Sequence, residues 1–120
     1  MQPTALVLAV LACVAIIVLG ARFLITPQRA TTDFGVAAGD VRALTAIKGV
    51  RDITSGVVLL VVWAAAGSQP LGWALLAAAL TPLGDAAIVR ARGGRLATAL
   101  GVHGLTALVL VAAGLVLALS

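Results

Sequence analysis

Large aromatic side chains are scarce in this chain of 120 residues, which has two Phe, two Trp and no Tyr. Small residues are abundant instead, with 13 glycines and many alanines. Small residues allow neighbouring helices to approach closely, as they do inside membranes. We therefore expect tight helix packing through small side chains rather than through large ones.

Metal-binding and disulfide-forming residues are equally scarce. Cys13 is the only cysteine, so no disulfide and no cysteine-based metal site can form within one chain. His103 is the only histidine, and HxxxH or ExxH spacings are absent. We expect no metal and no other cofactor.

Charge is low and hydrophobicity is high. Only 10% of the residues are charged and 62% are hydrophobic, and the mean hydropathy is +1.21. These values lie outside the range of soluble globular proteins. Alternation with a period of two residues, which is typical of membrane β-barrels, is absent. The composition predicts an all-α, polytopic membrane protein with a four-helix transmembrane bundle.

Four apolar segments are long enough to cross a bilayer, which takes about 20 helical residues. Asp40 is the expected N-cap of the second helix, and the GSQP turn after Ala66 predicts an antiparallel hairpin. The first segment lacks the basic region and cleavage site of a signal peptide, so we expect it to remain as a helix. The expected helices cover residues 4–24, 43–66, 71–89 and 96–119 of a single domain over 1–120.

All eight basic residues fall on one side of this predicted topology. Positively charged loops stay in the cytoplasm, so we expect a cell membrane protein with both termini external. This bias also explains the isoelectric point near 11.3 without a nucleic-acid partner. Membrane lipids are the expected partners, and a homo-oligomer is left open. The eight residues are Arg22, Arg29, Arg42, Lys48, Arg51, Arg90, Arg92 and Arg95.

Three ionisable residues from three predicted helices lie at a similar depth in the membrane. At 1.5 Å per residue, Asp52 lies roughly 8 Å inside the cytoplasmic edge, Asp85 about 9 Å and His103 about 10 Å. Ionisable groups inside a bilayer face the protein interior and often mark function. We therefore predict Asp52, Asp85 and His103 as catalytic candidates, with His103 and Asp85 in direct contact or joined by one water.

The face of the second helix that carries Asp52 supplies further polar groups. Lys48, Arg51 and Ser55 share this face because residues three and four apart are neighbours on a helix. Arg22 ends the first helix at a similar height. We predict Arg22, Lys48, Arg51 and Ser55 as ligand-binding residues.

Five short segments resemble an uncharacterised family of small four-helix membrane proteins, catalogued as a domain of unknown function. In chain order they are GARFLITPQ, FGV, KGVRDITSG, PLGDAAIV and HGLTAL. The layout is also distantly similar to DoxX-type membrane proteins. The resemblance brings no established activity, but it implies that the polar residues belong to a shared design. The matching positions are Arg22, Phe23, Lys48, Gly49, Arg51, Asp52, Gly84, Asp85 and His103.

Three functions are compatible with these residues. The first is a cytoplasm-facing polar pocket for a small amphipathic or lipid-like molecule, with or without isomerase-type or cyclase-type acid–base chemistry. The second is a small proton-coupled transporter. The third is a structural subunit in which the polar cluster only locks the bundle. The residues leave open whether the protein is an enzyme.

Overall fold

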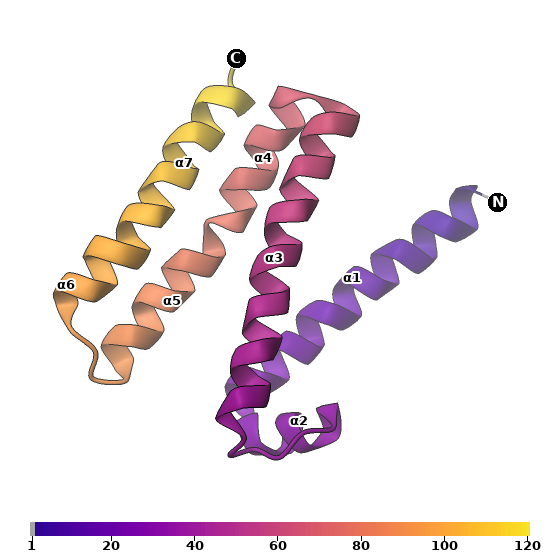
Figure 1. Cartoon of the computed structure of the whole chain (residues 1–120). Coiled ribbons are helices and arrows are strands. Elements are labelled where there is room, and N and C mark those ends of the chain that lie inside the picture. The colour runs from indigo at the N-terminus through magenta and orange to yellow at the C-terminus, as the bar shows by residue number, and fades with distance from the viewer. Residues whose placement is uncertain (1) are drawn as a thin grey trace. The chain divides into compact units, whose positions relative to one another are not determined.

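The computed structural model describes the backbone of residues 2–120 and their side chains, except those of Ala9 and Ala12. Within these residues the regular structure is entirely helical, as Figure 1 shows. The elements are α1 (Gln2–Ile25), α2 (Pro27–Phe34), α3 (Val41–Ala66), α4 (Ser68–Ala78), α5 (Leu80–Ala91), α6 (Leu96–Thr98), the π-helix η1 (Ala99–Gly104) and α7 (Leu105–Ala118).

Four helical stretches are long and apolar enough to cross a membrane: Gln2–Ile25, Val41–Ala66, Ser68–Ala91 and Leu96–Ala118. The predicted all-α, four-helix membrane fold is thereby confirmed. The third stretch begins three residues before the predicted start at residue 71. The reason is Gly67, whose φ of +91° ends α3 and lets α4 begin at the next residue.

The chain consists of two compact units, one ending at Lys48 and the other beginning at Gly49. The division falls within α3, so each unit is described by itself. The first unit holds α1, α2 and the beginning of α3. The second holds the rest of α3 and the helices from α4 to α7. A single domain over 1–120 stays a prediction.

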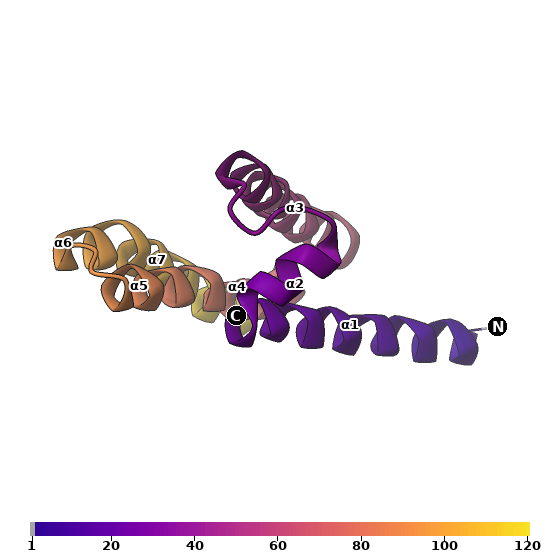
Figure 2. The ribbon, with the colours of Figure 1, turned by 90° about the horizontal axis from the view of Figure 1, so that it is seen from below.

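In the second unit, α4 and α5 run beside α6, η1 and α7 as an antiparallel pair (Figures 1 and 2). The helices approach closely at Gly72 of α4, where an added Cβ would meet backbone atoms of Gly114 and Ala118 in α7. The Gln69 amide also donates a hydrogen bond to the carbonyl oxygen of Ala118, at 3.2 Å. Small residues therefore allow this helix pair to approach closely, as the composition predicts.

Apart from Pro82, the buried apolar side chains of the described residues are all alanines. The large aliphatic side chains lie on the outside, where a bilayer would cover them. Hydrophobic burial within the chain is thus small, and contact between backbones takes its place in holding α4 to α7. The buried alanines are Ala30, Ala79, Ala99, Ala107 and Ala118.

Asp40 caps α3 as predicted, because its Oδ1 accepts a hydrogen bond from the backbone N–H of Ala43 at 3.0 Å. We expect Asp40→Ala to lower the free energy of unfolding by about 1 kcal/mol, the usual cost of losing such a cap. Asp40→Asn keeps the acceptor and should leave stability nearly unchanged. Thermal unfolding of the purified chain in detergent measures both. Equal losses in the two variants would mean that the charge, rather than the cap, matters.

Candidate functional site

Asp85 and His103 face each other between α5 and η1. Nδ1 of His103 lies 3.9 Å from Oδ2 of Asp85, and the two side chains are 28% and 32% exposed. The predicted approach of these two residues is confirmed. The pair lies within two helical stretches that are long and apolar enough to cross a membrane, where ionisable groups usually face the protein interior.

The helix that carries His103 departs from regular α-geometry. Residues Ala99–Gly104 form a π-helix, and the backbone N–H of Leu105 donates to the carbonyl oxygen of Leu100, five residues back. Gly101 and Gly104 surround His103, and glycine has a low helix propensity. Single π-turns inside α-helices occur frequently at functional sites. The wider turn therefore positions His103 differently from a regular α-helix.

The helix that carries Asp85 is interrupted as well. The break between α4 and α5 falls at Ala79, three residues before Pro82. Proline has no backbone N–H and clashes with the carbonyl four residues earlier, here that of Ala78. This carbonyl therefore loses its usual α-helical donor at the point where the helix is interrupted. The helices that carry Asp85 and His103 are thus both irregular near these residues.

His103 lies on a packed face of its helix. Ala99 and Ala107, four residues to either side, are 1% and 3% exposed. Pro82 of α5 is also buried. The imidazole and the carboxylate therefore lie in a seam of small residues. About a third of each side chain remains accessible.

On α3, the predicted site residues keep their shared face because the helix is continuous from Val41 to Ala66. Lys48, Arg51, Asp52 and Ser55 have the spacing of neighbours on that face. The Ser55 hydroxyl donates to the carbonyl oxygen of Arg51 at 2.9 Å, so toward a ligand it acts as an acceptor. The convergence of Asp52 with Asp85 and His103 stays a prediction.

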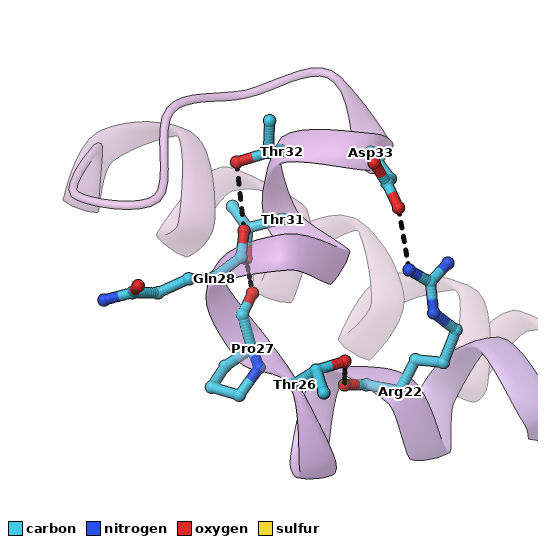
Figure 3. Close-up of polar contacts among 7 residues, drawn as sticks. All are labelled: Arg22, Thr26, Pro27, Gln28, Thr31, Thr32 and Asp33. Carbon is cyan, nitrogen blue, oxygen red and sulfur yellow. Dashed lines mark hydrogen bonds and ion pairs between the residues drawn. The ribbon is translucent and has the colours of Figure 1, made fainter.

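Arg22 has a partner that the sequence analysis did not consider. Its guanidinium Nη2 donates to Oδ2 of Asp33 on α2, at 2.7 Å (Figure 3). Next to this ion pair, the rings of Phe23 and Phe34 meet edge to face, with centroids 6.1 Å apart. The guanidinium is therefore used to attach α2 to the end of α1.

The sequence also contains a signal for α2, which lies outside the four predicted helices. Pro27 stands at the first helical position, and Gly35 follows the last residue with a φ of +115°. Proline at the start and glycine after the end are typical of a short helix. The backbone N–H of Val36 donates to the carbonyl oxygen of Thr31, which completes a Schellman-type ending.

Comparison with protein families gives one assignment for nearly the whole chain. Residues 13–117 match the model of a domain of unknown function, DUF4267. No curated protein and no solved structure is significantly similar to the chain. The likeness to DoxX-type proteins rests on the layout of the sequence and stays a prediction. The protein, with its four helices of membrane-spanning length, therefore belongs to the uncharacterised DUF4267 family.

Proposed function

We propose that the protein binds a small amphipathic or lipid-like molecule at a polar site in the cytoplasmic half of the membrane. Asp85 and His103 form the centre of this site. Asp52, together with Arg51 and Ser55 on the same face of α3, supplies further polar groups on the basis of equal depth. Arg22 is left out of the site, because Asp33 already neutralises its charge.

The observation that carries the proposal is the Asp85–His103 pair between two irregular helices. A plain structural pair needs neither a π-turn nor a proline break, and both cost regular hydrogen bonds. The partial exposure of both side chains leaves room for a third polar group. A molecule dissolved in the bilayer can reach the pair from the side.

Acid–base chemistry would suit this pair of groups. A carboxylate beside an imidazole can take up and return a proton near neutral pH, as general bases and acids do. An isomerisation or cyclisation of an apolar substrate needs only such a proton shuttle. Binding is the proposed function, and turnover is an extension of it at the same residues.

Transport is less well supported. The outer halves of the four membrane-length helices carry no ionisable residue. A proton released from His103 or Asp85 would therefore lack side-chain carriers on its way out within one chain. The structural alternative, in which the pair only locks the helices, is separated from binding by the experiment below.

The test is recovery of a bound molecule. The full chain is purified in mild detergent after exposure to a bacterial lipid extract, and the molecules that remain bound are identified by mass spectrometry. We expect one class of amphipathic molecule on the wild type, reduced at least tenfold by His103→Gln. Gly56→Ala is the matched control, since nothing lies within 4 Å of its new Cβ. Equal recovery from all three proteins would overturn the proposal.

The orientation is part of the proposal, because it places the site on the cytoplasmic side. All eight basic residues lie in or near two connections that share one side if each long helix crosses the membrane. We expect a reporter fused after Ser120 to be active only outside the cell. The same reporter inserted between Arg92 and Arg95 should be active only in the cytoplasm. A cytoplasmic C-terminus would reverse the orientation.

A further inference from the structure

We infer that Asp85 is a positioning residue that holds His103 as its Nδ1–H tautomer and leaves Nε2 as the basic atom of the site. The inference deepens the proposed function, since it specifies the chemistry of the ligand. The tautomer itself does not depend on any ligand. The geometry supports this arrangement, because the pair joins Nδ1 of the ring to Oδ2 of the carboxylate.

The distance between Nδ1 and Oδ2 is compatible with a hydrogen bond that shortens when a ligand binds. At 3.9 Å, the gap exceeds the upper end of N–H···O distances by about 0.7 Å. Catalytic and binding hydrogen bonds are often long in the empty protein and shorten when a ligand is bound.

No competing charge sits beside the ring on the elements packed against η1. Those elements are α5, α6 and α7. Asp85 is the only acidic residue from position 53 to the C-terminus. Arg90 also lies on α5, but its guanidinium donates to the carbonyl oxygen of Gly94 in the connection. Asp85 is therefore the charged acceptor beside Nδ1–H, and a hydrogen bond to one ring nitrogen decides which one carries the proton.

The tautomer fixes the kind of ligand. An unprotonated Nε2 accepts a hydrogen bond and donates none. Its best partner is an amphipathic molecule with a hydroxyl at its polar end. A phosphodiester or an ether offers only acceptors and would leave Nε2 without a partner. The site thus selects an amphipathic molecule whose polar end donates a hydrogen bond, and an amphipathic alcohol is the ligand class we propose.

The presence of one histidine makes the test direct. The full chain is labelled with ring ¹⁵N-histidine in lipid nanodiscs, and the two ring nitrogens are observed by NMR above pH 8. We expect the signal of a protonated Nδ1 and an unprotonated Nε2. Asp85→Asn should convert at least part of the population to the Nε2–H form, while Asp40→Asn should change nothing. A wild-type protein in the Nε2–H form would overturn the inference without any variant.

The second arm tests the ligand class with dodecan-1-ol and its methyl ether added to the same nanodiscs. We expect the alcohol, and not the ether, to move the Nε2 signal. An Nδ1–H tautomer with no response to the alcohol would refute the proposed alcohol ligand while supporting the positioning role. An Nε2–H tautomer would refute the positioning role whatever the alcohol does. The two failures are therefore distinguishable.

Discussion

Replacing Gly114 with alanine is expected to lower the free energy of unfolding by about 1–3 kcal/mol, the usual cost of overfilling a packed interface. A Cβ on Gly114 would lie 2.9 Å from the carbonyl oxygen of Gly72 and 2.9 Å from Cγ of Leu76. The leucine can change rotamer, but the Gly72 oxygen belongs to the backbone of α4. The two helices must therefore separate. Unfolding of the purified chain by added SDS measures the loss.

Gly56→Ala is the matched control for this prediction. It makes the same chemical change in a membrane-length helix, where the new Cβ meets nothing within 4 Å. Alanine also raises helix propensity by about 1 kcal/mol over glycine, so this control should be neutral or stabilised. If both variants behaved alike, close approach of α4 and α7 would not be what holds the pair.

Binding of the amphipathic molecule is expected to strengthen about tenfold from pH 5.5 to pH 8 in the wild type and to stay flat in His103→Gln. Imidazole is the side chain that changes charge in this range. An imidazolium carries a proton on both ring nitrogens, so in that form Nε2 cannot accept from a hydroxyl. A buried hydrogen bond left unmade costs about 1–3 kcal/mol, and 1.4 kcal/mol corresponds to a factor of ten. Affinity measured across the pH range tests the prediction.

Melting temperatures recorded over the same pH range provide the control. A site for binding requires that affinity per folded molecule falls in His103→Gln while the fold survives. If the melting temperature of His103→Gln drops sharply while its affinity per folded molecule does not change, the pair only holds the helices together and is not a binding site. A pH dependence that persists without the imidazole would assign the effect to another group.

Residue counting along apolar segments was enough to predict the Asp85–His103 approach. Both residues lie about six positions from the same short connection, so their equal depth follows from the rise per residue. The Asp40 cap was equally accessible, because capping depends on sequence neighbours alone. These predictions succeeded because each one needs only local geometry and the requirement to cross a bilayer.

Other features of the site could not be read in this way. The π-turn at Ala99–Gly104, which packs against α5, has no sequence signal beyond two glycines. The Arg22–Asp33 ion pair joins two helices whose relative angle is set by the residues between them. The position of Arg22 along its helix predicts that it lies at the membrane surface, but this position does not predict which acidic residue it pairs with.

The alanine and glycine seam between the helices has a consequence for how such a sequence can vary over evolution. Outside the seam, leucine, isoleucine and valine can replace one another freely, because fluid lipid adapts to each shape. At Gly72 and Gly114, a mutation that adds a single carbon already meets backbone atoms. Selection at such positions therefore acts on size rather than on hydrophobicity, and the fold depends more on its smallest residues than on its largest.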